Sequence, residues 1–244
     1  ITQSSFTLSH TIDILSSFQS SDKRPSSLED PSFTKITISE KASREPASKL
    51  YLKPGDTISV HKAIEAMTVK SANDVAYAVA EFLSGSEAAF ASRMTQKARQ
   101  LGMSSTIFRN ASGLPDKRQI STARDMARLG IALRKKFPEY YHYFGMRTFT
   151  FKGKKIRGHN RVLGKLKGAD GIKTGYTRAS GFNLATSVRY NGKHLVAVIM
   201  GEDSGRIRDT HMVQLLEKFI QTQAHGPLQE MFHIQLIVFI LGIF

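Results

Sequence analysis

Two strand-like segments joined by a two-residue turn place the strongest constraint on the fold of this chain. Residues 183–190 and 194–200 are predicted strands, and Asn191-Gly192 lies between them. Both turn residues tolerate a positive φ, so this dipeptide is a strong signal for a tight antiparallel hairpin. Residues 148–151 (Thr-Phe-Thr-Phe) predict another strand before it. The C-terminal half should therefore contain an antiparallel sheet.

Helical periodicity dominates the sequence before these strands. Residues 60–69 predict one helix, Ser71 opens a second, and Ser86 and Ser121 can cap a third and a fourth. A last helix is predicted over residues 207–219. Helices, then strands, then a helix predict an α/β fold of the α+β type, in which helices flank an antiparallel sheet.

The chain divides into three predicted parts by composition. Residues 1–33 are serine-rich without sustained periodicity, residues 34–220 have the consistent patterns of a domain, and residues 221–244 form an apolar tail. No charged-then-apolar signal peptide is visible at the start. The apolar run at 231–244 is shorter than the roughly 20 residues that span a bilayer. We expect this end to be buried, disordered or in peripheral contact with a membrane.

The formal charge of +15, from 35 Lys+Arg and 20 Asp+Glu, leaves several anionic partners open. Ten of the basic residues lie between Arg147 and Arg178, where Asp170 is the single acidic residue. Nucleic acid is not expected as a partner, because the sequence has no recognisable binding module or interleaved aromatic residues. The absence of cysteine excludes disulfides, thiol catalysis and cysteine-based zinc sites.

Two short polar motifs carry the chemistry. Ser71-Ala72-Asn73 lies where a loop enters a predicted helix, and Lys173-Thr174-Gly175 precedes the predicted hairpin. Alone, each motif is an ordinary helix cap or turn. Together, with about a hundred residues between them, they become a far more specific signal than either motif alone.

These motifs and the segments around them resemble the D-alanyl-D-alanine carboxypeptidases, the low-molecular-mass penicillin-binding proteins of the serine acyl-transferase superfamily. The resemblance runs through about residues 34–217. Further segments that carry it are Ile36–Ala42, Leu52–Asp56, Gly113–Asp116, Ser121–Ala127, Gly158–Arg161 and Gly171–Thr177. It implies a β-lactamase/transpeptidase-like fold without metal or cofactor. It also implies removal of the terminal D-alanine of peptidoglycan stem peptides, binding of β-lactam antibiotics, and a periplasmic or other extracytoplasmic location.

The resemblance also implies roles for individual residues. Ser71 would relay the proton towards the leaving amine, and Asn73 would hold the substrate amide and the catalytic lysine in register. Lys173 would provide positive charge beside that relay, and Thr174 would donate a hydrogen bond to the substrate carboxylate. Gly175, without a side chain, would let the substrate backbone lie against the strand edge.

The sequence departs from the family at the nucleophile, a Ser-x-x-Lys box expected about sixty residues before Ser71. Formal matches elsewhere include Ser20/Lys23 and Ser32/Lys35. Pro25 conflicts with a helix through the first match, and a strand-like run overlaps the second. The alternative function is therefore a catalytically inactive penicillin-binding homologue that has lost its nucleophile.

Two other interpretations have less support. A serine β-lactamase would carry Ser-Asp-Asn where this chain has Ser71-Ala72-Asn73. His159 could be a general base or a metal ligand, but no second histidine or carboxylate stands at ligand spacing. His211, on the last predicted helix, is interpreted as structural.

Overall fold

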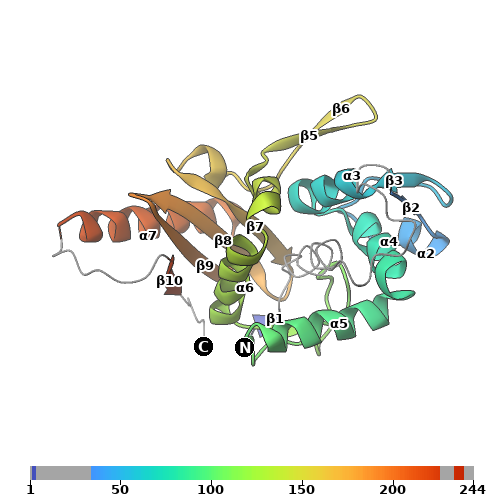
Figure 1. Ribbon diagram of the computed structural model, residues 1–244, viewed down its shortest axis with the longest axis horizontal. Helices are drawn as coiled ribbons and strands as arrows, with labels where there is room; N and C mark the ends of the chain where they lie inside the picture. Colours follow the sequence, from blue (N-terminus) through green and yellow to red (C-terminus); the bar gives the residue numbers. More distant parts are fainter. Residues whose placement is uncertain (1, 4–33, 226–233, 239–244) are drawn as a thin grey trace.

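A four-stranded sheet forms the centre of the C-terminal half (Figure 1). The computed structural model describes residues 2–3, 34–225 and 234–238. The strand order is β10-β9-β8-β7, with β7, β8 and β9 antiparallel and β10 parallel to β9. These strands are β7 (Ala169–Thr177), β8 (Gly181–Tyr190), β9 (Lys193–Glu202) and β10 (Ile234–Val238). The predicted hairpin is confirmed, because Asn191 and Gly192 join β8 to β9 with φ values of 46° and 73°.

Helices cover both faces of this sheet, α6 (Ala123–Lys136) on one and α7 (Gly205–His225) on the other (Figure 1). Side chains of a strand alternate between faces, and the buried residues of β9 divide accordingly. Val196 and Val198 belong to the cluster that contains residues of α6, whereas Leu195, Ala197 and Ile199 pack with Met212 and Leu216 of α7. The helix-covered antiparallel sheet confirms the predicted fold class.

A helical layer stands beside the sheet and holds the motif that begins at Ser71 (Figure 1). Its helices are α2 (Glu40–Arg44), α3 (Val60–Glu65), α4 (Asn73–Ser84) and α5 (Glu87–Gln100), with a π-helix, η2 (Ala66–Lys70), between α3 and α4. Two 3₁₀ segments, η3 (Pro138–Gly145) and η4 (Val162–Gly164), connect other elements. Three short strand pairs complete the described fold: β1 (Thr2–Gln3) with β4 (Ile120–Ser121), β2 (Lys35–Thr37) with β3 (Thr57–Ser59), and β5 (Thr148–Phe151) with β6 (Lys154–Arg157).

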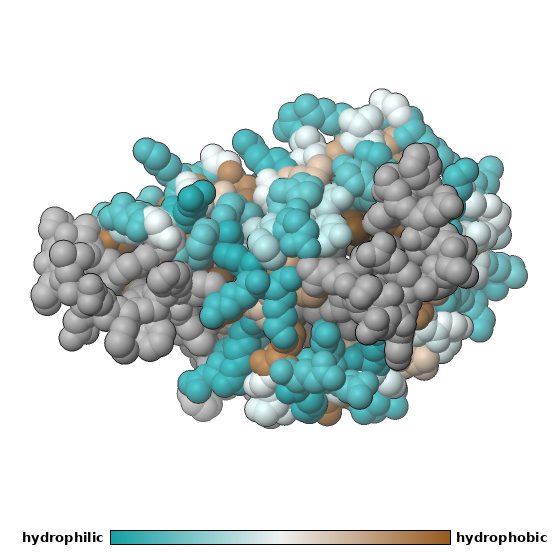
Figure 2. Space-filling view, viewed as in Figure 1, coloured by the Kyte–Doolittle hydropathy of each residue, from teal (hydrophilic) through white to brown (hydrophobic). Residues whose placement is uncertain are grey.

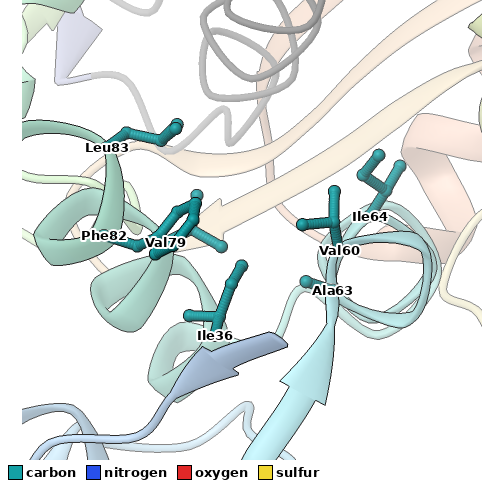
Figure 3. Close-up of a pocket in the computed structure, with 7 residues that line it drawn as sticks. All are labelled: Ile36, Val60, Ala63, Ile64, Val79, Phe82 and Leu83. Carbon is teal, nitrogen blue, oxygen red and sulfur yellow. The ribbon is translucent and has the colours of Figure 1, made fainter. Parts of the chain in front are cut away.

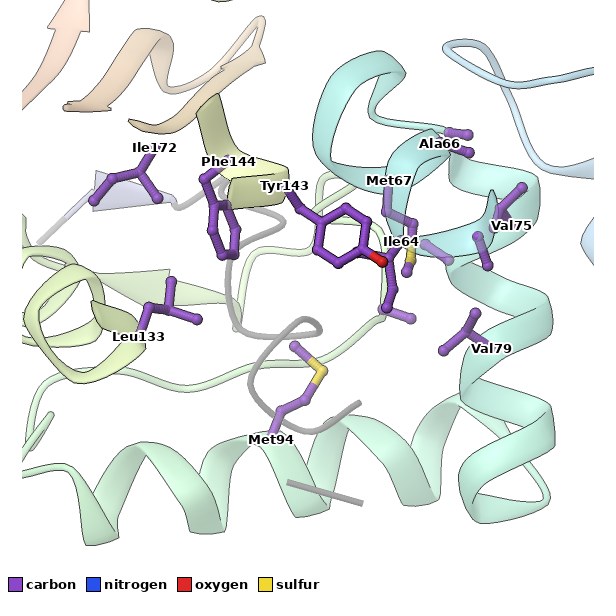
Figure 4. Packing of buried hydrophobic residues seen from close by; sticks show 14 of the residues in the cluster. Ile64, Ala66, Met67, Val75, Val79, Met94, Leu133, Tyr143, Phe144 and Ile172 are labelled. Atoms are coloured by element: carbon purple, nitrogen blue, oxygen red, sulfur yellow. The ribbon is translucent and has the colours of Figure 1, made fainter. Parts of the chain in front are cut away.

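One buried cluster joins the helical layer to the sheet face under α6. Met67, Phe144 and Ile172 come from three different elements and share this cluster (Figure 4). Gly130 of α6 permits the close approach, because a Cβ there would lie 2.7 Å from Cδ1 of Ile172. The sheet and the helices therefore share a core, and the surfaces between them are fixed in position.

An apolar groove between β2, α3 and α4 is a second feature of the helical layer (Figure 3). Its lining residues are Ile36, Val60, Ala63, Ile64, Val79, Phe82 and Leu83. All are apolar, so the groove has no side chain that could transfer a proton or bind a charge. On the face drawn in Figure 2, apolar residues show only as small separate areas.

The cap of α6 differs from the prediction. Ser121 was expected to begin this helix, but it lies in β4 and its Oγ is 2.9 Å from Oγ1 of Thr106. Thr122 is the N-cap, and its Oγ1 accepts the backbone N–H of Asp125 at 3.1 Å. Serine and threonine can both cap a helix. Because Ser121 is paired in β4, the next residue, Thr122, caps α6.

Two further predictions need correction. Lys173-Thr174-Gly175 was placed ahead of the strands, but it lies inside β7. The predicted helix over residues 60–69 changes from α to π hydrogen bonding at Ala66. Strand β6 was not predicted at all; it follows β5 after a turn at Lys152-Gly153, where both residues have positive φ.

The predicted division at residues 33 and 220 stays a prediction, because residues 4–33, 226–233 and 239–244 lie outside the described part of the chain. Within the apolar tail, Ile234–Val238 pairs with β9. The helices in the described ranges include none with the length and apolar character needed to cross a membrane.

The packing of α7 can be tested at two positions of that helix. Leu216 is fully buried against the sheet, whereas Ile207 is 39% exposed. Leu216→Ala should lower the free energy of unfolding by about 2–5 kcal/mol, because it leaves a cavity at the sheet. Ile207→Ala should lower the free energy of unfolding by clearly less. Urea unfolding followed by circular dichroism measures both, and equal losses would contradict this arrangement.

Candidate active site

A cleft of ≈ 870 Å³ lies between the helical layer, the edge strand β7 and the start of α7. Ser48 and Ser71 line it from the helical side, Gly113 and His159 from two loops, Thr174 from β7 and Arg208 from α7. Asn73 and Gly175 also line the cleft. The structure therefore brings both predicted motifs into one concave site.

Ser71 occupies the junction between η2 and α4. Its φ of 57° and ψ of 46° place it in the left-handed region, which residues other than glycine seldom adopt. A π-helix immediately before it is also uncommon, and such turns are frequent at functional sites. The bend between the two helices positions Ser71 on the wall of the cleft.

Lys173 contacts Ser71 although 102 residues separate them in the chain. The Nζ atom of Lys173 donates a hydrogen bond to Oγ of Ser71 and another, of 3.0 Å, to the carbonyl oxygen of Thr174. The Lys173 side chain is buried, with 3% of the residue exposed. The predicted meeting of hydroxyl and ammonium groups is therefore present.

Burial and the charge of Arg208 together lower the pKa of Lys173 to about 7. Desolvation is the larger cause, since a buried amine loses the water that stabilises its charged form. Near neutral pH Lys173 can therefore both release and accept a proton. A group with such a pKa beside a serine hydroxyl is suited to general acid–base chemistry.

Asn73 and Asp74, at the start of α4, hold the loop that forms the opposite wall. The Asn73 side chain donates to the carbonyl oxygen of Pro46 at 2.9 Å, and its backbone N–H donates to that of Ser48 at 2.8 Å. The buried carboxylate of Asp74 accepts two backbone N–H groups from the same loop, those of Leu50 and Leu52. Asn73 therefore contributes to the wall through this loop, and its predicted contact with substrate stays a prediction.

Arg208 is a site residue that the sequence analysis missed. It is 5% exposed, forms an ion pair of 2.6 Å with Asp209 and donates to the carbonyl oxygen of Asn183 at 3.3 Å. One signal was present in the sequence. Arg206 and Arg208 lie near the N-terminus of a helix, where the helix dipole disfavours cations. Such a placement indicates a function other than helix stability.

His159 lies at the cleft, and burial together with the charges of Lys173 and Lys70 lowers its pKa. His211 is hydrogen-bonded to Glu202 at 2.8 Å, in line with a structural interpretation. In the formal matches Ser20/Lys23 and Ser32/Lys35, three residues (Ser20, Lys23 and Ser32) fall outside the described part of the chain. Lys35 is exposed at the start of β2 and is not among the described residues that line the cleft.

The pKa of Lys173 predicts a pH dependence of stability. Below about pH 7 the amine is protonated in the folded and unfolded states, and above its usual pKa of 10.5 it is neutral in both. Between these values the unfolded chain holds a proton that the folded chain has released, so raising the pH favours the folded state. The Lys173→Met variant should not show this increase in stability with pH. Urea unfolding of both proteins between pH 7 and 10 measures it, and parallel curves would contradict the lowered pKa.

Comparison with known proteins identifies the family of this chain. Residues 27–204 match the sequence profile of the family described as D-alanyl-D-alanine carboxypeptidase. The carboxypeptidase DacC of Escherichia coli is 37% identical over 171 residues, which are 70% of this chain and 43% of DacC. DacF of Bacillus subtilis is 32% identical over 197 residues, 78% of this chain and 50% of DacF. The chain thus spans about half the length of these curated relatives.

Comparison with solved structures leads to the same family. The carboxypeptidase DacD from Francisella tularensis superposes with a TM-score of 0.80 at 27% identity, over 88% of this chain and 63% of that one. Penicillin-binding protein D2 from Listeria monocytogenes, in its ampicillin-bound form, superposes with a TM-score of 0.75 at 29% identity, over 89% of this chain and 85% of that one. Since the family profile covers most of the chain and the helix-covered sheet matches, this protein belongs to the D-alanyl-D-alanine carboxypeptidase family.

Proposed function

We propose that this cleft binds the D-Ala-D-Ala end of a peptidoglycan stem peptide and supports release of its terminal D-alanine. The contact between Lys173 and Ser71, which joins both motifs at one point, is the observation that carries the proposal. Family membership adds to it, because the two relatives compared above are both D-alanyl-D-alanine carboxypeptidases.

Recognition of the peptide terminus follows from the groups along β7. Thr174 and Gly175 line the cleft, and among the described residues β7 pairs only with β8, which leaves its other edge open. An extended peptide can add to such an edge through backbone hydrogen bonds. The Thr174 hydroxyl and the nearby Arg208 guanidinium would then bind the terminal carboxylate. Hydrogen bonds to a charged group are among the stronger ones.

Proton transfer is the proposed task of Ser71 and Lys173. A serine hydroxyl attacks the carbonyl carbon between the two D-alanines, an ester forms, and the amide bond to the last D-alanine breaks. The proton from the attacking hydroxyl passes through Ser71 to the leaving amine, with Lys173 as the group that holds or returns it. Water then hydrolyses the ester. The described residues include no Ser-x-x-Lys pair at the cleft that could be assigned as the nucleophile box.

The proposed partners are anionic peptides of the cell wall and β-lactam antibiotics. The ampicillin-bound relative from Listeria supports the second of these. We place the protein outside the cytoplasm, where peptidoglycan is found. The cationic segment between Arg147 and Arg178 would favour association with that polymer through long-range attraction.

An inactive binding homologue is the second candidate. The position of Lys35 favours it, because this lysine is exposed in a strand instead of following a serine by one helical turn. Such a protein would keep Ser71, Lys173 and Thr174 for recognition but would form no acyl-enzyme.

Intact-mass spectrometry after incubation with benzylpenicillin distinguishes the two candidates. A stoichiometric mass increase, assigned by digestion to one serine, would establish acylation and identify the nucleophile. An adduct on Ser32 would restore the formal pair that includes Lys35. A folded chain without any adduct would support the inactive homologue and contradict the hydrolytic function.

Binding of the carboxylate gives a separate test that needs no turnover. A tripeptide ending in D-Ala-D-Ala should bind more tightly than the same peptide with a C-terminal amide, because the amide removes the charge. Thr174→Val should weaken binding of the free acid by roughly tenfold to a hundredfold and leave the amide almost unaffected. Isothermal titration calorimetry measures all four combinations. Equal affinities for acid and amide would contradict carboxylate recognition.

A further inference from the structure

We propose that Asp170 and Arg134 are positioning residues, which fix the start of β7 in the register that directs Lys173 to Ser71. The proposal rests on the proposed function for its chemical meaning, since it concerns the same lysine. The residues that support it lie outside the cleft, on the face of the sheet that α6 covers.

Asp170 is held by two elements other than its own strand. Its carboxylate accepts a hydrogen bond of 2.5 Å from the hydroxyl of Ser187 on β8 and another from the guanidinium of Arg134 on α6. The side chain of Arg134 is 15% exposed and that of Asp170 is 34% exposed. This is a partly buried ion pair with a second hydrogen-bond donor, a more directional arrangement than an exposed surface pair.

Tyr141 completes the cluster from η3. Its hydroxyl lies 2.7 Å from Oγ of Ser187, and the guanidinium of Arg134 stacks over its ring at 3.8 Å. Burial raises the pKa of Tyr141 to about 12, so the phenol stays protonated at physiological pH. Arg134 of α6, Tyr141 of η3 and Ser187 of β8 therefore form one connected cluster with the Asp170 carboxylate of β7.

The cluster coincides with an irregularity in the strand pairing. Ala169 pairs with Val188, but the next pair is Gly171 with Ser187, so Asp170 is an extra residue without a partner in the ladder. A bulge of this kind changes the side to which every later side chain points. If the bulge were lost, a one-residue slip would turn Lys173 away from the cleft.

Gly171 shows how closely the cluster contacts the strand. A Cβ at this position would lie 3.0 Å from Oγ of Ser187 and 3.0 Å from the Tyr141 hydroxyl. The bulged strand thus packs directly against the hydroxyl groups of Ser187, which donates to Asp170, and Tyr141. Lys173 follows two residues later, with little chain between the anchor and the reactive amine.

The pKa of Lys173 offers a readout that reports position. Burial and Arg208 lower it, and the charge of Asp170 is not among its causes. Loss of a nearby negative charge can by itself only lower the pKa of an amine, so a rise reports that Lys173 has moved. His159 also lines the cleft, and the charge of Lys173 contributes to lowering its pKa, so its titration gives a second signal.

The experiment is an NMR titration of the full chain with 13Cε-labelled lysine, the Lys173 signal being assigned with Lys173→Met. Asp170→Asn should raise the pKa of Lys173 by at least one unit, towards its usual value, as the amine becomes hydrated. Tyr141→Phe, which removes one hydroxyl from the cluster, should give a smaller rise. Asp170→Glu, which restores the charge, should recover part of the wild-type value.

Leu133→Ala is the matched control, because Leu133 is fully buried on α6 next to Arg134. It should destabilise the protein without changing the Lys173 titration. An unchanged Lys173 pKa in Asp170→Asn, or an equal shift in Leu133→Ala, would overturn the proposal. If Asp170→Asn does not fold, Tyr141→Phe and Ser187→Ala decide the question by the same criterion.

This outcome can be separated from failure of the proposed function. If wild-type protein neither binds the D-Ala-D-Ala peptide nor reacts with benzylpenicillin, the function is wrong, while the effect of Asp170 on Lys173 can still be measured. If peptide binding holds and the Lys173 titration ignores Asp170, the positioning role alone is wrong.

Discussion

The contact between Lys173 and Ser71 is the interaction on which the site depends. A lysine amine that is buried loses its hydration, and this loss is tolerated here because the amine has two oxygen acceptors and a pKa near neutrality. The contact also requires that an edge strand and a turn between two helices stay within hydrogen-bonding distance. The surrounding structure meets this requirement by sharing one core between the sheet and the helical layer.

Several features of that core are explained by the need to fix both partners. Gly130 lets α6 approach Ile172, the residue before Lys173. Asp74 secures the loop beside Ser71 through backbone hydrogen bonds, and Ser71 itself is held in a left-handed conformation. A conformation of this kind costs free energy and persists only where neighbouring contacts maintain it.

The sequence was informative wherever a local pattern determined the structure. Asn191-Gly192 predicted the hairpin because few residues tolerate its backbone angles, and the family resemblance that the two motifs carry implied that Ser71 and Lys173 would share a cleft. The bulge at Asp170 and the burial of Arg208 were not predictable, because both depend on partners far away in the sequence. Ser121 failed as a cap for a related reason, since pairing with a distant segment drew it into a strand.

Arg208 and Asp209 show why the site cannot be explained by stability alone. A buried ion pair gains little over well-packed apolar residues, because both charges lose their hydration. Next to Lys173, however, the Arg208 charge lowers the pKa of the lysine, while Asp209 compensates part of that charge. The pair therefore keeps a cation in the cleft, where the proposed carboxylate would bind, and at the same time allows Lys173 to lose its proton. Two apolar residues at these positions would pack equally well and would supply neither property.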